Sequence, residues 1–425
     1  MPVTTMLAQQ PYRRGERRVY APASSVVLDG APSRVSRPAL RASRRADVFW
    51  EVATPTWTVS WENRQGIEFL ISRGYRPRPW VDLSVSEDQA TRQLWERRQA
   101  APPFVRLRIL SAVLHWRVLT TQQIASFVGT NAILSDLTLL WQAGLVWRGG
   151  MVSKSAYNKA PSDVIWRAAP DAKINRLLRR MTASERLGLL GGAEWGSMVS
   201  SPGHDLMVAD LSLRAAELAP QIAAVYGEAL STQFKVSGVP GNARGDATWV
   251  RSDGLKVVVE MSSSYNKQTW GKVGRWVRVL AEDRSLAVLF VVGGHPSYSL
   301  GRSSQMVAKY RETIAEAAWS QMSSITARAP DRIGVVSLTE WFPEPMRVAP
   351  DFGLLPAWRP TGKPGDRFER AYFGDAGSVT FDPDDAGGEQ VVMTPVRNAA
   401  KVFATPWWLV REQGPKPKTT AGFAT

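Results

Sequence analysis

The chain has 425 residues, with 53 lysines and arginines against 38 aspartates and glutamates, a formal net charge of +15 and a pI near 10.2. This length predicts two or three domains, and the 44% hydrophobic content is sufficient for buried cores. The sequence has no cysteine, which excludes disulfides, thiol catalysis and thiolate zinc sites, and its three histidines are too few for a histidine-rich metal cage. The basic excess favours polyanionic partners and salt-sensitive association.

No hydrophobic stretch approaches the roughly 18 residues that a membrane-spanning helix needs. The best apolar run, Leu286–Val292, has the length of a buried strand. The first ten residues lack the apolar core of a secretory signal. We therefore expect a cytoplasmic protein with no membrane partner.

The first 103 residues divide into two zones. Residues 1–45 are rich in proline, serine, alanine and arginine, with arginine pairs at 13–14, 17–18 and 44–45. This composition predicts a disordered basic arm, which either holds a phosphate backbone or is simply a solvated tail. Residues 46–103 form a tryptophan-rich N-terminal segment, in which we expect a polar helix from Ser86 to Gln99.

The next segment, residues 104–169, has the pattern of a winged helix-turn-helix. Hydrophobic side chains at three- and four-residue spacing predict a first helix that packs on one face. Thr120 or Thr121 is the expected N-cap of the second helix, and Gly144 is expected to end the third. The elements, in order, are a helix over 104–114, a short helix over 119–128, a third helix over 131–143 and a wing hairpin with strands at 145–148 and 164–167.

Modules of this kind most often contact double-stranded DNA through the third helix and the wing. The third helix has no lysine or arginine, so its polar side chains would read bases while cations around the wing attract phosphates. The same arrangement also serves as a protein-docking module without DNA contact. The candidate DNA-binding residues are Asn131, Ser135, Thr138, Gln142, Arg148, Lys154 and Arg167.

Three further zones follow. Residues 170–203 comprise a helix rich in arginine and leucine and a glycine- and serine-rich linker, and residues 344–425 form a proline- and glycine-rich C-terminal extension with short strand-like pieces at 378–381 and 391–393. Residues 204–343 alternate helices and strands, which predicts an α/β domain with a mixed sheet. Its expected order is a helix (205–218), three strands (222–228, 246–250 and 255–261), a helix (267–282), a strand (286–292), a helix (304–321) and a strand (333–338).

Two acids occupy unusual positions in this domain. Asp246 opens one strand after Gly245, and Glu260 lies near the end of the next strand, after Val257–Val259. A carboxylate at the end of a buried strand is costly to desolvate unless it is paired, hydrogen-bonded or bound to a cation. Because neighbouring antiparallel strands bring such ends together, we expect the two carboxylates to lie side by side and either to bind a divalent cation or to raise one pKa.

Gly245-Asp246 followed by Glu260 resembles the PD-(D/E)xK nuclease superfamily, in which two such acids hold magnesium on adjoining strands, and the αβββαβ order agrees with that fold. More narrowly, a winged helix followed by His204-Asp205-Leu206, Glu228, Gly245-Asp246-Ala247 and Val259-Glu260-Met261 resembles the replication-relaxation family of actinobacterial plasmids and mobile elements. The similarity covers roughly residues 104–300. It implies a restriction-endonuclease-like mixed-sheet domain after the winged helix.

This resemblance also implies a magnesium site. Asp246 and Glu260 would hold Mg²⁺, Glu228 could complete the site, and the ion would activate water for phosphodiester attack. The family pattern has a lysine two residues after the second acid, where this chain has Ser262. Lys256, four residues earlier on the same face of the strand, could substitute. Two lysines of the following helix, Lys267 and Lys272, are further candidates.

The sequence therefore favours a DNA-binding accessory protein of plasmid, phage or mobile-element replication or mobilisation, with a degenerate nuclease-like domain. Relaxosome or replication proteins are the partners that this role implies. The alternative is a Mg²⁺-dependent DNA endonuclease or nickase. We expect Asp246 and Glu260 to bind Mg²⁺ or Mn²⁺. We expect little DNA cleavage, because Ser262 replaces the lysine that would stabilise the transition-state charge.

Overall fold

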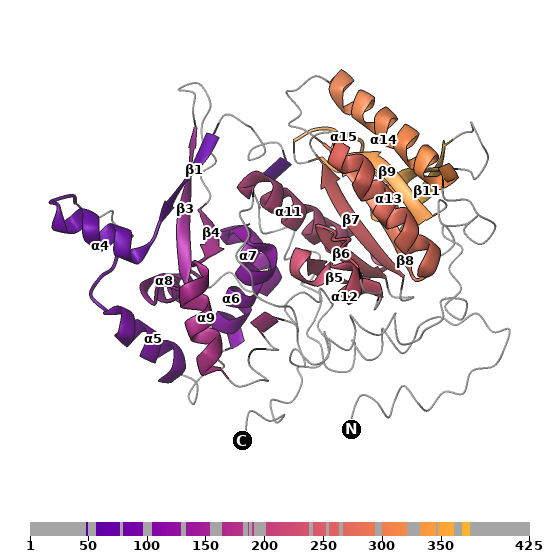
Figure 1. Ribbon diagram of the computed structural model, residues 1–425. Helices are drawn as coiled ribbons and strands as arrows, with labels where there is room; N and C mark the ends of the chain where they lie inside the picture. The colour runs from indigo at the N-terminus through magenta and orange to yellow at the C-terminus, as the bar shows by residue number, and fades with distance from the viewer. Residues whose placement is uncertain are drawn as a thin grey trace. The chain divides into compact units, whose positions relative to one another are not determined.

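The structure of the protein is a computed structural model. It describes residues 48–49, 57–76, 80–96, 104–128, 133–153, 164–181, 186, 189–190, 201–237, 241–251, 255–262, 267–293, 300–320, 332–345, 347–360 and 368–374. The described residues divide into two compact units, which we call the N-terminal unit (up to Leu213) and the C-terminal unit (from Arg214 onward). Figure 1 shows the elements of both units, and the division falls inside helix α11, Pro202–Leu218.

The N-terminal unit is an assembly of helices around one antiparallel sheet, whose strand order is β1-β3-β4-β2. Its central part contains the three expected helices and the hairpin, and a short strand that the sequence did not predict, β2, separates the first two helices. The elements are β1 (Trp57–Glu62), α4 (Arg64–Ser72), α5 (Glu87–Glu96), α6 (Phe104–Trp116), β2 (Val118–Thr120), α7 (Thr121–Val128), α8 (Leu134–Gln142), β3 (Val146–Ser153), β4 (Ile165–Ala168) and α9 (Asp171–Arg180).

Two of the predicted helix boundaries are confirmed by their hydrogen bonds. Thr120 caps α7, because its hydroxyl accepts from the Gln123 backbone at 3.0 Å while the Gln123 side chain accepts from the Thr120 backbone at 3.0 Å. Gly144 follows the end of α8 with a φ of 67° and donates to the Trp141 carbonyl, as expected for a glycine C-cap. The predicted turn residue Gly129 lies outside the described residues.

Helix α6 differs from the prediction of one buried face. Every residue from Ile109 to Trp116 is buried, including Ser111 and His115. The reason is that α7, α8, β4 and the segment around Leu189 pack around the helix, and the Ser111 hydroxyl donates to the Leu189 carbonyl at 2.7 Å. The helix is therefore the central core element of its unit.

Strand β1 is an element that the sequence did not predict. It pairs antiparallel with β3 over six residues, from Trp57 opposite Ser153 to Glu62 opposite Arg148. The tryptophan-rich segment thus adds a fourth strand to the sheet that contains the hairpin strands β3 and β4.

The C-terminal unit contains a seven-stranded mixed sheet, ordered β11-β10-β9-β8-β7-β6-β5. Strands β5, β6 and β7 are antiparallel neighbours, whereas β7, β8 and β9 are parallel to one another. The elements after α11 are β5 (Ile222–Gly227), η2 (Glu228–Leu230), α12 (Gln233–Ser237), β6 (Ala247–Arg251), β7 (Lys256–Ser262), α13 (Lys267–Glu282), β8 (Leu286–Val292), α14 (Leu300–Ser320), β9 (Ile333–Ser337), α15 (Leu338–Trp341), η4 (Phe352–Leu354), β10 (Pro356–Pro360) and β11 (Phe368–Tyr372).

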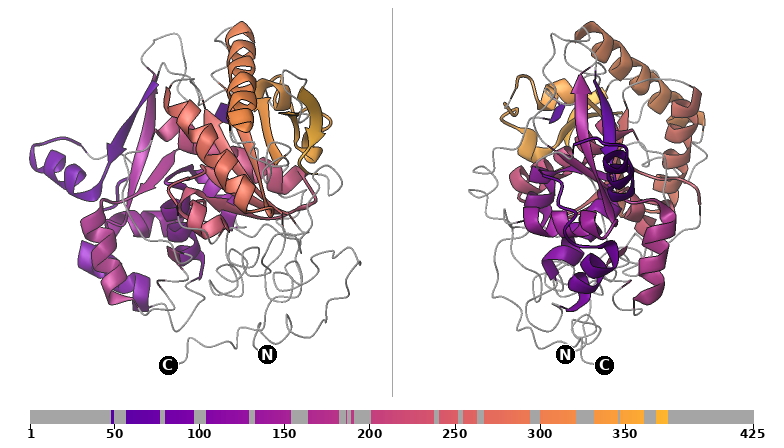
Figure 2. Two further views of the ribbon diagram at one scale, coloured as in Figure 1. Left: turned by 45° about the vertical axis from the view of Figure 1, so that its right-hand side comes forward. Right: turned by 90° about the vertical axis from the view of Figure 1, so that its left-hand side faces the viewer.

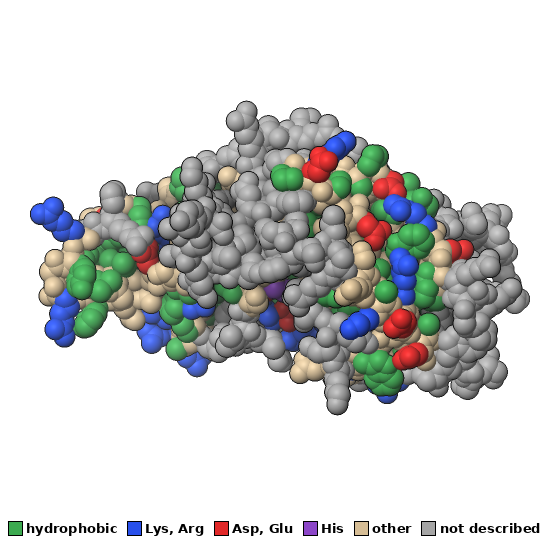
Figure 3. Space-filling model, turned by 90° about the horizontal axis from the view of Figure 1, so that it is seen from above, with side chains coloured by type: hydrophobic (Ala, Val, Ile, Leu, Met, Phe, Trp, Pro, Cys, Tyr) green, Lys and Arg blue, Asp and Glu red, His purple; other side chains and the backbone are tan. Residues whose placement is uncertain are grey.

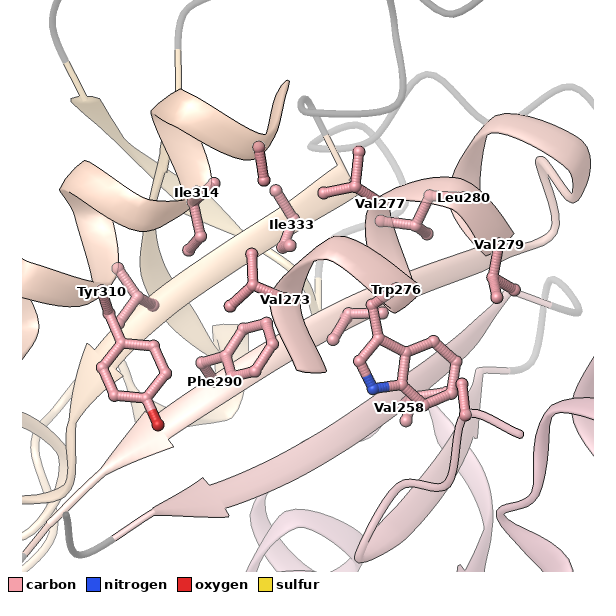
Figure 4. Close-up of a cluster of buried hydrophobic side chains, with 14 of the residues drawn as sticks. Val258, Val273, Trp276, Val277, Val279, Leu280, Phe290, Tyr310, Ile314 and Ile333 are labelled. Carbon is pink, nitrogen blue, oxygen red and sulfur yellow. The ribbon is translucent and has the colours of Figure 1, made fainter. Parts of the chain in front are cut away.

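Helices α13 and α14 cover the same face of this sheet (Figures 1 and 2). Helix α13 connects β7 to its parallel neighbour β8, and α14 connects β8 to its parallel neighbour β9. Both connections move across the sheet in the same direction, and right-handed connections of that kind place their helices on the same face. Figure 4 shows the core between them and the sheet, where Trp276, Tyr310 and Phe290 pack with aliphatic side chains. Because helices and other segments cover both faces, β8 is buried at all seven residues and reads as an unbroken apolar run.

The structure confirms the predicted order of elements over 204–343, but the sheet does not end there. Strands β10 and β11 come from the predicted C-terminal extension, and β10 joins the sheet beside β9. The strand-like pieces at 378–381 and 391–393, the basic arm 1–45 and most of the linker before α11 lie outside the described residues. Within the described ranges, none of the helices combines the length and apolarity needed to cross a membrane.

Candidate functional site

The carboxylate of Glu260 is fully buried between the sheet and α13. Residues 256, 258, 260 and 262 of β7 share one face because side chains alternate along a strand. Val258 belongs to the core that packs beneath α13, so Glu260 also points toward that helix. Its relative exposure is 0%, which is unusual for a glutamate and requires compensating partners.

Asp246 lies directly beside Glu260. Strands β6 and β7 pair with Ala247 opposite Val259, so the next register position places Asp246 opposite Glu260 on the same face. The Asp246 backbone N–H donates to the Val259 carbonyl at 2.9 Å, and the Asp246 Oδ2 accepts from the Met261 N–H at 2.7 Å. The two acids are therefore neighbours at one edge of the sheet, as the sequence predicted.

The cation of this site is Lys272, from the second turn of α13. Its ammonium donates to Glu260 Oε2, and the Trp276 indole N–H donates to Glu260 Oε1 at 2.6 Å. Lys272 and Trp276 are four residues apart and so share one face of the helix. Both carboxylate oxygens of Glu260 thus have donors from α13.

These contacts change the pKa values of the cluster. Burial raises the pKa of Glu260 and the negative charge of Asp246 raises it further, although Lys272 and Trp276 act in the opposite direction. Burial by itself lowers the pKa of Lys272, but the carboxylates of Glu260 and Asp246 raise it above its ordinary value. The raised pKa of Glu260 agrees with one of the two outcomes expected for a close acid pair, and binding of a divalent cation stays a prediction.

Tyr310 of α14 completes the cluster, and sequence reasoning missed it. Burial raises the pKa of its phenol, whereas the nearby Ser262 and Thr269 act in the opposite direction. Ser262, the residue in place of the expected lysine, therefore lies near a tyrosine that is almost fifty residues away in sequence. Figure 4 shows the Tyr310 ring and the Trp276 indole beneath their helices. No local signal pairs α14 with this strand end.

One predicted site residue does not join the cluster. Lys256 was expected to substitute for the missing lysine, but it lies at the opposite end of β7, where its ammonium donates to the Val236 carbonyl and lies 3.8 Å from Asp283. Four strand residues span about 13 Å, which explains why a lysine on the correct face cannot reach Glu260. Glu228 follows β5 in the turn η2, at the register position after the Gly227–Ala247 pair and so next to Asp246, and its carboxylate lies 3.5 Å from Arg244. The side chain of Lys267 lies outside the described residues.

The cluster does not fit a magnesium ion as it stands. Mg²⁺ requires near-octahedral oxygen ligation, usually with one or two carboxylates that face open space and water. Glu260 is completely buried and both of its oxygens already accept from Lys272 and Trp276. In the part of the chain that the structure describes, no group of three acidic or histidine side chains could hold a metal ion. Lys272 instead supplies the positive charge next to the acid pair.

The candidate DNA-contacting side chains of α8 are placed unevenly. Ser135 is exposed, and Thr138 is half-buried with its hydroxyl donating to the Leu134 carbonyl at 2.9 Å. Gln142 is buried, and its side-chain amide donates to the Asp82 carbonyl at 3.0 Å, so it is not placed to reach a base edge. Asn131 lies outside the described residues. Helix α5 packs against α8, which further restricts this helix as a reading surface.

The wing arginines are held by the tryptophan-rich segment. Arg148 stacks on the Trp80 ring at 3.9 Å and lies 3.6 Å from Glu62. Arg167 lies between two indoles, 4.5 Å from the Trp61 centroid and 4.4 Å from the Trp147 centroid. Such stacking fixes a guanidinium within the protein. Lys154 lies outside the described residues.

Comparison with protein-family models, with curated proteins and with solved structures found no significant match to this chain.

Proposed function

We propose that this chain is a double-stranded DNA-binding protein, built from a winged helix-turn-helix and a nuclease-like domain. In that domain the ammonium of Lys272 occupies the acid site. The observation that carries the proposal is the order and pairing of α6, β2, α7, α8, β3 and β4. Two helices after a short strand, followed by a hairpin whose second strand pairs with that short strand, are the parts of a winged module. The net charge of +15 supports a polyanionic ligand.

The second part of the proposal rests on the C-terminal unit. The order α11, β5, β6, β7, α13, β8 matches the αβββαβ pattern that the resemblance to PD-(D/E)xK nucleases implies. Asp246 and Glu260 lie at the strand positions where the PD-(D/E)xK pattern has its two metal-holding acids. The Lys272 ammonium already neutralises the buried Glu260, and a domain of this kind can bind DNA without cleaving it. An accessory role in replication or mobilisation, with replication or relaxosome proteins as partners, is the biological setting that we propose.

The test of DNA binding is the salt dependence of affinity for a fluorescently labelled duplex. We expect anisotropy titrations to show binding at about 50 mM salt that weakens steeply by about 200 mM, because displaced counterions drive the association. A chain that shows no binding to duplex DNA at the lower salt concentration would contradict the proposal.

A Mg²⁺-dependent endonuclease or nickase is the second candidate. The convergence of Asp246, Glu260 and Lys272 favours it, but it requires the ion to displace the Lys272 ammonium and the Trp276 indole from Glu260. Supercoiled plasmid incubated with the protein and Mg²⁺ or Mn²⁺ distinguishes the two. We expect the plasmid to stay supercoiled. Metal-dependent nicking that Asp246→Ala abolishes would establish the nuclease instead.

A further inference from the structure

Helix α9 presents an arginine face to solvent. Ile174, Leu177 and Leu178 are the buried positions that dock the helix on its unit. Arg176, Arg179 and Arg180 are exposed and stand three and four residues apart, so they lie on one side of the helix. We call these three side chains the α9 arginine face. Among the described residues, none of the three guanidiniums has an ion-pair, hydrogen-bond or ring partner.

The helix itself does not account for this face. The negative end of a helix favours Arg179 and Arg180 in the last turn, but Arg176 lies in the middle, where that effect is absent. Like charges at i and i+4, such as Arg176 and Arg180, oppose helix formation by about 0.2–0.5 kcal/mol. An anion from outside the chain would remove this repulsion.

Four other described cations of the N-terminal unit are engaged within the protein. Arg148 and Arg167 stack on tryptophans, Arg106 pairs with Asp136 at 2.6 Å, and Lys173 pairs with Glu87 at 2.8 Å. The face of the C-terminal unit shown in Figure 3 differs, because there Lys and Arg side chains alternate with Asp and Glu. All side chains of the α9 arginine face, in contrast, carry a positive charge.

We propose that the α9 arginine face binds the phosphate backbone of double-stranded DNA, and that this helix contributes more to affinity than the polar side chains of α8. The proposal rests on the proposed DNA-binding function. Three guanidiniums along one side of a rigid helix match the repeated charges of a phosphate backbone. Binding of single strands relies on aromatic stacking platforms, whereas the exposed positions of α9 are Arg, Asn and Ala. These residues favour a duplex.

The test compares two charge-matched triple variants of the full chain. The first is Arg176→Gln, Arg179→Gln and Arg180→Gln. The control is Arg73→Gln, Arg76→Gln and Arg278→Gln, which removes three exposed arginines elsewhere and produces the same net charge. Glutamine keeps helix propensity, and circular dichroism with thermal unfolding verifies that each variant is folded.

We expect the α9 variant to bind the labelled duplex at least about tenfold more weakly at about 100 mM salt. The slope of log affinity against log salt concentration should decrease in magnitude by about 2.7, which is about 0.9 for each of the three lost phosphate contacts. The control variant should retain most of the affinity. A third variant with lysine at the three α9 positions should keep the slope, because the slope follows charge and not side-chain shape.

The outcomes separate this inference from the function on which it rests. If the unmodified chain binds duplex DNA and the α9 and control variants bind it equally, the α9 assignment is wrong while DNA binding stands. If the unmodified chain binds no duplex DNA, both proposals fail. If the α9 variant loses binding to duplex RNA but not to duplex DNA, the ligand of this face is RNA and the DNA assignment is overturned.

Discussion

At the residue scale, the Glu260–Lys272 pair decides what the acid cluster can do. A buried carboxylate that loses its cation is left uncompensated, and breaking such a pair costs about 3–5 kcal/mol. Lys272 keeps 30% of its side-chain exposure, so the lower part of that range applies.

We predict that Lys272→Met lowers the free energy of unfolding by about 3 kcal/mol near pH 8, and by less near pH 5. Without the lysine, the pKa of Glu260 rises further. A carboxyl group whose folded pKa exceeds its unfolded pKa stabilises the fold at low pH and loses that contribution as pH rises. Urea unfolding at both pH values measures the difference.

The control for this change is Arg278→Met on the same helix, because Arg278 is an exposed cation outside the cluster. It should alter stability by no more than about 0.5 kcal/mol at either pH. An equal loss for Lys272→Met at pH 5 and pH 8 would show that the Glu260 charge is not what the lysine compensates.

The sequence could identify the two acids but not their cation. Asp246 and Glu260 were predicted as a pair because Asp246 opens one strand and Glu260 lies near the end of the next, apolar strand. Lys256 was the preferred candidate, with Lys267 and Lys272 as further ones, because the rotation of α13 relative to β7 depends on tertiary packing and not on local pattern. The four-residue spacing of Lys272 and Trp276 was a usable signal for one helix face, but nothing local aimed that face at Glu260.

At the element scale, the close contact of β1 with β3 depends on Gly149. A Cβ at this position would lie 2.7 Å from Ile165 Cγ1 and 2.7 Å from Trp61 Cζ3. Trp61 is also the indole on which Arg167 stacks, so the glycine helps to place both the strand and the arginine. The neighbouring Gly150 has nothing within 4 Å of the same position.

We predict that Gly149→Ala destabilises the N-terminal unit by about 1–3 kcal/mol, because the added methyl group overpacks this contact. Gly150→Ala should be neutral or stabilise by up to about 1 kcal/mol through the unfolded chain. Thermal unfolding of both variants makes the comparison. Equal stability of the two would argue that β1 does not pack on β3 as described.

Elements with a strong hydrophobic pattern were predicted well, and those defined by strand pairing were not. Helix α13 and strand β8 have the bounds expected from their hydrophobic patterns. Strands β1 and β11 are edge strands, and their pairing partners decide whether such short segments become strands. Asp246 was expected inside β6 but lies just before it, an ordinary difference at a strand end.

At the scale of the whole molecule, the two units carry buried groups that respond to pH in opposite ways. Burial lowers the pKa of His115, in the core of the N-terminal unit, to about 3. The unfolded chain then binds more protons as pH falls below about 6.5, so this group destabilises its unit on acidification. Glu260 in the C-terminal unit has a raised pKa and therefore acts in the opposite direction.

We predict that shifting the pH from 7 to 5 lowers the protection of α6 amides against hydrogen exchange relative to those of β7, after correction for intrinsic rates. Mass spectrometry of peptides from the two elements measures this. The variant His115→Gln should reduce the loss at α6, provided that it is folded at pH 7. Protection that falls equally in both elements would contradict the assignment to these two groups.

The pairing of β1 with β3 also has a consequence during synthesis on the ribosome. Roughly 90 residues separate the two strands in sequence. At a translation rate of about 5–20 residues per second, β3 is synthesised about 5–20 s after β1. Throughout that time Trp57, Val59 and Trp61 lie on an unpaired strand, which is a template for association with other nascent chains. Molecular chaperones that shield this strand should therefore raise the yield of native protein. Slower translation should lower it, because the strand is then exposed for longer.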